Sequence, residues 1–281
     1  MFSILMRLIG RLSVGRKLIL IYALDLTAVI FVSGILINEK FIAIDFARKE
    51  IVGNQYISVV REALFAPQTI TGNVLRDAEA RFGEGMDSGE LAAPFAQRLE
   101  DPDKTRWPQA IQAARALIIR IGNQSNLILD PDLDSYYTMS LIVLRFPELF
   151  ELVEEIRTQT VETAGSSLEK NRLQTAYLIL EGQLDAVIKG IDTDYAEAIS
   201  AARPVTKEDL SAARATLLAA IHRFRAGAHE AVFGEESDDT SHTAHVSPNI
   251  DAMATTLLAD LDRTWGAAQA TLHRLLDARL D

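Results

Sequence analysis

Residues 18–37 read LILIYALDLTAVIFVSGILI, a run of 20 residues with a single charged side chain, Asp25. At a rise of 1.5 Å per residue, a helix of this length spans a hydrocarbon core roughly 30 Å thick. A buried helix of a soluble protein rarely stays apolar on every side over such a length. The sequence therefore predicts a transmembrane helix over residues 18–37.

The charges beside this segment predict its orientation. Residues 1–17 contain three arginines and one lysine, whereas Lys40 follows the segment beside Glu39. Positive side chains collect on the cytoplasmic side of a membrane. We therefore expect residues 1–17 in the cytoplasm and residues 38–281 in the periplasm, with the helix in a bacterial inner membrane. A cleaved secretory signal would end in small residues, and residues 37–40, INEK, offer no such site.

Asp25 lies about two turns into the predicted span. A carboxylate inside a membrane is costly and often marks a functional contact. One interpretation is a polar contact with another membrane helix, which would place Asp25 in the signal path. The other is an acid near the cytoplasmic interface that water can reach, and the sequence leaves both open.

Composition narrows the class of protein for the rest of the chain. The net charge is -11, and residues 1–37 carry +3, so residues 38–281 carry -14. Such an acidic body argues against nucleic acid as a partner and against broad contact with anionic lipid. The chain has no cysteine, which excludes disulfides, thiolate nucleophiles and zinc–thiolate sites. Abundant Ala, Leu, Glu and Arg favour long helices.

Helical periodicity dominates residues 38–123. The pattern continues from residue 38 to about Arg76, which predicts that the membrane helix runs directly into the outer domain. A Gly-rich break at 82–90 and a second break at 101–108 flank a short helix near 91–99. Another helix is expected from Pro108 to about Asn123.

The second half of the chain predicts four more helices. Asp130 as N-cap and Pro131 at the first helical position predict a helix that runs to about Thr163, with a kink at Pro147. Its buried stripe is expected to contain Tyr137, Leu141, Leu144, Leu152 and Ile156.

A capping box formed by Ser166 and Glu169 predicts the start of the next helix. Its apolar residues recur every three or four positions, at Leu173, Tyr177, Leu180, Leu184, Val187, Ile191, Tyr195 and Ile199. Arg203-Pro204 ends this helix, and Thr206 with Asp209 predicts the beginning of another.

Residues 234–248 are polar and acidic and predict a loop before a last helix that begins near Asn249. No alternating strand pattern is present. The fold class is therefore predicted as all-α, with an N-terminal transmembrane helix that continues into an elongated antiparallel helical bundle of the four-helix type. One module or two stacked modules are both compatible with the pattern.

Catalytic and metal-binding motifs were sought without success. The chain lacks a Gly-rich phosphate loop, HExxH and GxSxG. A calcium loop starting at Asp130 would need Gly at Ser135 and Glu at Leu141. His242 and His245 lie in the acidic loop, where a solvated surface is the simpler interpretation than a metal site. We therefore expect no enzyme activity, no cofactor and no metal.

Two stretches are unusual enough to suggest a ligand site. They are residues 53–56, GNQY, and residues 126–137, NLILDPDLDSYY, which bring three carboxylates and two phenols close together. Carboxylates attract cations, and aromatic faces stack on ligands or contact cations. The candidate ligand-binding residues are Tyr56, Asn126, Asp130, Asp132, Asp134, Tyr136 and Tyr137. The alternative is structural, with Asp130 as a helix cap and the tyrosines packed between helices.

These stretches carry a resemblance to a receptor family. The block SNLILDPDLDSYYTMSLIVLRFPEL at 125–149, with ARKEIVGNQYI at 47–57, resembles the periplasmic sensing region of certain methyl-accepting chemotaxis proteins. Similar regions occur in transmembrane histidine kinases and diguanylate cyclases. The resemblance implies ligand sensing between two membrane helices, followed by a cytoplasmic output module. This sequence ends at Asp281, about where the second membrane helix is expected.

Two functions are compatible with these observations. In the first, the chain is a receptor sensing module with one membrane span, which homodimerises and responds to a small molecule or a periplasmic binding protein. In the second, it is a single-span anchored structural or interaction protein of the cell envelope.

Overall fold

The computed structural model describes residues 13–161, 167–234 and 249–280, and all regular structure in these ranges is helical. The prediction of an all-α fold is confirmed. The chain divides into two compact units, Met1–Ala47 and Arg48–Asp281. The division falls within the first described helix, α2 (Val14–Phe65).

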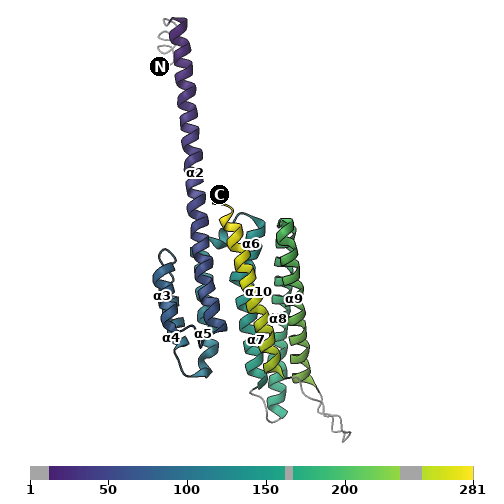
Figure 1. Ribbon diagram of the computed structural model, residues 1–281. Coiled ribbons are helices and arrows are strands. Elements are labelled where there is room, and N and C mark those ends of the chain that lie inside the picture. Colours follow the sequence, from purple (N-terminus) through teal and green to yellow (C-terminus); the bar gives the residue numbers. More distant parts are fainter. Residues whose placement is uncertain (1–12, 162–166, 235–248, 281) are drawn as a thin grey trace. The chain divides into compact units, whose positions relative to one another are not determined.

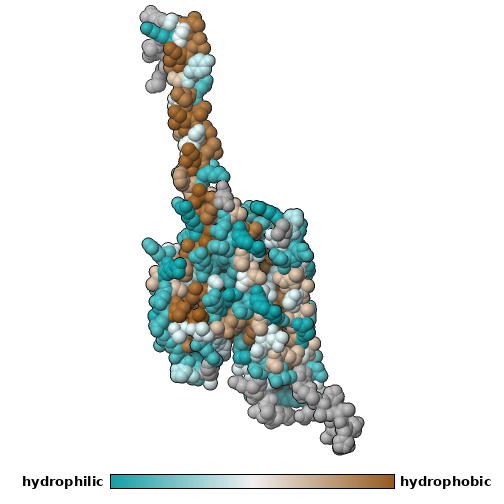
Figure 2. Space-filling view, in the orientation of Figure 1, coloured by the Kyte–Doolittle hydropathy of each residue, from teal (hydrophilic) through white to brown (hydrophobic). Residues whose placement is uncertain are grey.

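The N-terminal part of α2 contains the apolar segment 18–37. Its large apolar side chains, such as Leu24 and Phe31, are exposed on all sides, and Figure 2 shows this part of the helix covered in hydrophobic side chains. Within the described residues, α2 is the one helix that is long and apolar enough to cross a membrane. Exposure of so much apolar surface to water is unfavourable by about 25 cal/mol per Å², so an apolar environment suits this segment.

The second unit begins with the C-terminal part of α2, which ends at Phe65. The predicted continuation of this helix to Arg76 is wrong. Pro67 lacks an amide hydrogen and disfavours helical geometry in the residue before it, so the chain turns at residues 66–71. A second helix, α3 (Gly72–Phe82), follows this turn.

Three short helices pack beside α2 in the second unit. They are α3, α4 (Gly89–Leu99) and α5 (Trp107–Gln124), and α3 packs on α4, which packs on α5. Both predicted breaks lie between these helices. Apolar side chains such as Leu75, Phe95 and Leu117 are fully buried between them.

The rest of the second unit is a four-helix bundle (Figure 1). The first helix of the bundle, called an arm below, is continuous through α6 (Leu133–Ser140), a π-helical turn (Leu141–Arg145) and α7 (Phe146–Val161). The other arms are α8 (Ser167–Ala201), α9 (Pro204–Phe233) and α10 (Ile250–Asp277). The arms close into a ring, because α7 packs on α8, α8 on α9, α9 on α10, and α10 on α7.

A π-helical turn precedes Pro147, where the sequence predicted a kink. The Phe146 amide donates to the Leu141 carbonyl, five residues back, and Pro147 has no amide hydrogen to continue the α-helical pattern. The extra residue of a π turn shifts the phase of the side chains. Leu144 is therefore exposed, although the sequence placed it in the buried stripe, whereas Leu141 is buried as expected.

Helix starts in the bundle agree with the sequence except in detail. The last helix begins where the sequence predicts, near Asn249, and the Asn249 side chain caps it by accepting from the Ala252 amide at 3.0 Å. The start of α9 lies at Pro204 rather than near Thr206, because proline is well suited to the first helical position. The predicted cap at Ser166 lies outside the described residues.

Candidate functional site

The side chain of Arg279, just after α10, gathers the acidic residues of the segment 126–137. Its guanidinium lies 2.6 Å from Asp130 Oδ1, 2.9 Å from Asp132 Oδ2 and 3.2 Å from Glu50 Oε2. It also donates to Ser135 Oγ at 2.5 Å. We call Glu50, Asp130, Asp132, Ser135 and Arg279 the Arg279 cluster. It joins three parts of the second unit that are distant in sequence: α2, the start of α6 and the residues after α10.

The backbone of residues 126–135 positions these carboxylates. Asn126 adopts a left-handed conformation with φ of 69°, which asparagine tolerates better than most residues. A 3-10 turn, Leu127–Leu129, follows, and the Asp130 side chain accepts from the Asp132 amide at 3.0 Å. The helix then starts at Leu133 with Asp132 in the N-cap position.

The prediction that Asp130 caps the helix is therefore wrong by two residues. Asp130 instead stabilises the turn that precedes α6, and the Oδ1 atom that accepts from the Asp132 amide also accepts from Arg279. Asp134 is in the first turn of α6, where its Oδ1 accepts from the Ser135 amide at 2.9 Å. A carboxylate in this position is favourable to the helix dipole. Asp134 thus has a local structural contact, and Asp130 and Asp132 hold the contacts to Arg279.

Glu50 is the most buried acid of the Arg279 cluster, with a fully buried side chain. Burial, and next the negative charge of Asp130, raise the pKa of Glu50 to about 8, although Arg279 opposes this rise. One oxygen each of Glu50 and Asp130 is buried without a hydrogen-bond partner among the described residues. Three carboxylates therefore share one guanidinium, and protonation of Glu50 relieves part of the excess negative charge.

The side chain of Tyr56 contacts α3, not the segment 126–137 with which the sequence prediction groups it. Its hydroxyl donates to Glu79 Oε2 at 2.5 Å, and its ring lies beside Phe82. Ser88 donates to the same Glu79 carboxylate. Burial and the bond to Glu79 raise the pKa of Tyr56. Tyr56 and Glu50 are six residues apart on α2, which directs them about 120° apart around the helix.

The GNQY stretch holds three different helices to α2. A Cβ at Gly53 would overlap the side chain of Ser125 at the end of α5, so glycine permits this close approach. Asn54 donates to the Gln269 carbonyl of α10 at 3.0 Å, and Tyr56 binds α3 as described. These residues therefore have a structural use, which is the alternative that the sequence left open.

Tyr136 and Tyr137 lie on the first turns of α6. Their rings contact each other edge to face at 5.3 Å between centroids. Tyr137 packs partly against the core, whereas Tyr136 is exposed at 38% of its surface. Asp25 lies in the first unit, on the exposed apolar part of α2, and its role in signalling stays a prediction.

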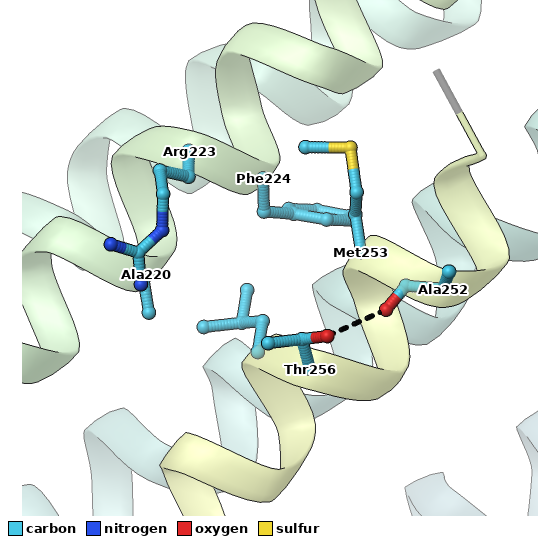
Figure 3. Close-up of a pocket in the computed structure, with 7 residues that line it drawn as sticks. Ala220, Arg223, Phe224, Ala252, Met253 and Thr256 are labelled. Atoms are coloured by element: carbon cyan, nitrogen blue, oxygen red, sulfur yellow. Dashed lines mark hydrogen bonds between the residues drawn. The ribbon is translucent and has the colours of Figure 1, made fainter.

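A pocket lies at the other end of the bundle, between α9 and α10 (Figure 3). Its volume is about 220 Å³, and its walls are Ala220, Arg223, Phe224, Ala252, Met253, Thr256 and Leu257. No motif in the sequence marks this pocket, because its residues are spread over the regular helices α9 and α10. The 28 residues of α10 span about 40 Å at 1.5 Å per residue, so this pocket and the Arg279 cluster are well separated.

Metal binding finds no support in the part of the chain that the structure describes. No group of three His, Asp or Glu side chains is arranged to hold an ion there, and Asp130, Asp132 and Ser135 bind Arg279 instead of forming a calcium loop. His242 and His245 lie outside the described residues.

Comparisons with known proteins assign no family to the chain. No family model, no curated protein and no solved structure matches it. Over the residues that the structure describes, the fold defines an all-helical protein with one candidate membrane-spanning helix.

Proposed function

We propose that the chain is the ligand-sensing region of a bacterial transmembrane signalling receptor, of the chemoreceptor or sensor-kinase type, and not an enzyme. In this proposal residues 38–281 lie in the periplasm, and two copies associate as a homodimer. The Arg279 cluster is the observation that carries it. One guanidinium ties α2 to the segment 126–137 and to the residues after α10, and a receptor needs such a tie to relate its helices to one another.

The proposed mechanism uses two arrangements of these helices. A ligand shifts the balance between them only if it binds one arrangement better than the other. The helix α2 contains both Glu50 and the apolar segment 18–37. A change in how Arg279 holds Glu50 therefore acts on the helix that carries the candidate membrane span.

The absence of cysteine makes this proposal testable by site-directed spin labelling. The full chain with Asn38→Cys, labelled and reconstituted in lipid nanodiscs, reports the distance between the two α2 helices of a dimer by double electron–electron resonance. Release of Glu50 by Arg279→Met is expected to shift this distance distribution. The matched variant Arg106→Met removes an exposed arginine paired with Asp101 and Asp103, and it should leave the distribution unchanged.

Two results would count against the receptor. The lack of any dipolar signal in nanodiscs loaded with two chains would remove the homodimer. Identical distributions for the parent and Arg279→Met would mean that the cluster does not control α2, and the anchored structural protein would then be the better explanation.

A further inference from the structure

The pocket between α9 and α10 combines an apolar interior with one cationic side chain. Phe224, Met253 and Leu257 are its large apolar lining residues, and Figure 3 shows Met253 beside the ring of Phe224. The Thr256 hydroxyl is engaged with the Ala252 carbonyl at 2.8 Å. A methionine thioether beside a ring adapts readily to flat or branched apolar groups.

Arg223 is the polar group of this pocket that is available for a ligand. In the described ranges of the chain no carboxylate lies within ion-pair distance of it, although acids outnumber basic residues throughout the protein. Arg225, two residues along α9, behaves differently and pairs with Glu181 and Asp185. An arginine that has no carboxylate partner among the described residues is a charge that an anionic ligand can match.

We propose that this pocket binds a small carboxylate with a compact apolar body, with the carboxylate on Arg223 and the body against Phe224 and Met253. The volume of about 220 Å³ lies below the range of roughly 300–1,000 Å³ typical of drug-sized ligands, which favours a molecule the size of benzoate or 4-methylpentanoate. A planar guanidinium binds a carboxylate through two parallel hydrogen bonds. Binding itself requires only the pocket, whereas its use in signalling rests on the proposed receptor function.

The position of the pocket links it to the Arg279 cluster. A ligand there contacts both α9 and α10, and α10 runs without interruption from Ile250 to Asp277, two residues before Arg279 (Figure 1). A packed helix transmits small shifts along its whole length. The carboxylate ligand would therefore act at one end of α10, and its effect on α2 would be exerted at the other end.

The test uses the full chain in lipid nanodiscs, labelled with ¹³C at the methionine methyl groups and titrated with benzoate. The Met253 resonance is assigned by its loss in Met253→Leu. We expect a saturable shift of this resonance, and Arg223→Gln should weaken the apparent affinity about tenfold or more, because a hydrogen bond to a charged group is lost. Benzyl alcohol, which keeps the ring without the charge, should bind as weakly to the parent as benzoate does to Arg223→Gln.

Matched controls separate the pocket from the lipid. Empty nanodiscs measure partition of benzoate into the bilayer, and Arg172→Gln removes an exposed arginine of α8 that does not line the pocket. The Arg172 variant should bind benzoate like the parent. The pocket assignment is overturned if neither benzoate nor 4-methylpentanoate gives a saturable shift, or if Arg223→Gln binds as well as the parent.

The two proposals fail in different ways. Saturable benzoate binding that leaves the spin-label distances of Asn38→Cys unchanged would retain the pocket and remove the link to signalling. An absence of carboxylate binding, together with altered distances in Arg279→Met, would remove the pocket and retain the receptor.

Discussion

Replacement of Arg279 by methionine tests the Arg279 cluster most directly. Methionine keeps much of the apolar stem and removes the cation that, among the described residues, pairs with Glu50, Asp130 and Asp132. Loss of one partner of a buried ion pair costs about 3–5 kcal/mol, since the remaining charge is buried without compensation. The question is how much of this cost applies to each of the three carboxylates.

The three carboxylates contribute unequally. Asp132 is 61% exposed at its side chain, so water replaces Arg279 there at a cost below about 1 kcal/mol. Burial raises the pKa of Glu50 to about 8, which favours its neutral form and so lowers the cost of leaving it without a cation. Asp130 is fully buried at its side chain and carries most of the cost. Because Arg279 itself is 21% exposed, we expect a loss of about 2–3 kcal/mol at pH 7.

The assay is urea unfolding of the full chain in a mild non-ionic detergent, followed by far-ultraviolet circular dichroism. Arg106→Met is the matched control, because Arg106 is 58% exposed and its pairs are on the surface, and it should lose less than about 1 kcal/mol. The loss of unfolding free energy in Arg279→Met should increase above pH 8. In that range Arg279 stabilises the ionised Glu50 of the parent, whereas Glu50 of the variant has no cation beside it.

A double-mutant cycle decides whether Asp130 is the responsible group. Asp130→Asn in the Arg279→Met background removes the uncompensated charge and should restore part of the lost stability, so the two changes are not additive. If Arg279→Met unfolds at the same urea concentration as Arg106→Met, the cluster contributes nothing to stability, and the reasoning from its burial is refuted.

Two further changes probe α2. Burial raises the pKa of Glu50 from 4.5 to about 8, so the folded state holds a proton that the unfolded state has lost. The parent therefore loses stability as the pH rises through that window. Glu50→Gln should flatten the decline of the urea midpoint between pH 5 and 9, and an unchanged slope would contradict the pKa assigned to Glu50. Gly53→Ala places a Cβ against Ser125 and should lower the unfolding free energy by about 1–3 kcal/mol. Gly182 has open space around it, so Gly182→Ala should be neutral or stabilising by up to about 1 kcal/mol. Equal urea midpoints for the two variants would argue against the close approach of α2 and α5.

The helices were predictable from the sequence because their signals are local. The stripe of α8 and its end just before Arg203-Pro204 depend on residues within a few positions of each other. The errors have local causes too. Pro67 ends α2 although the helical periodicity continues past it, and Asp132 rather than Asp130 is the N-cap of α6, because a 3-10 turn precedes Asp130.

The site itself was only half predictable. The sequence singled out Asp130 and Asp132 but not their partner, because Arg279 is 149 residues from Asp130 and no local pattern relates them. Glu50 did leave a signal, since it occupies a buried position beside Ile51 on α2, where an apolar residue is the usual choice. A charged residue in an apolar stripe predicts a buried partner without telling which one.

The polar contacts of α2 also bear on the kind of motion that a signal requires. Three of them cross to α10 and the residues after it: Asn54 to Gln269, Arg61 to Asp262, and Glu50 to Arg279. A seam of apolar side chains alone would tolerate small sliding movements. Displacement along this seam breaks all three contacts together and leaves buried polar groups unpaired, each at about 1–3 kcal/mol. Intermediate positions are thus unfavourable, and α2 is expected to move relative to α10 between discrete registers rather than by gradual sliding.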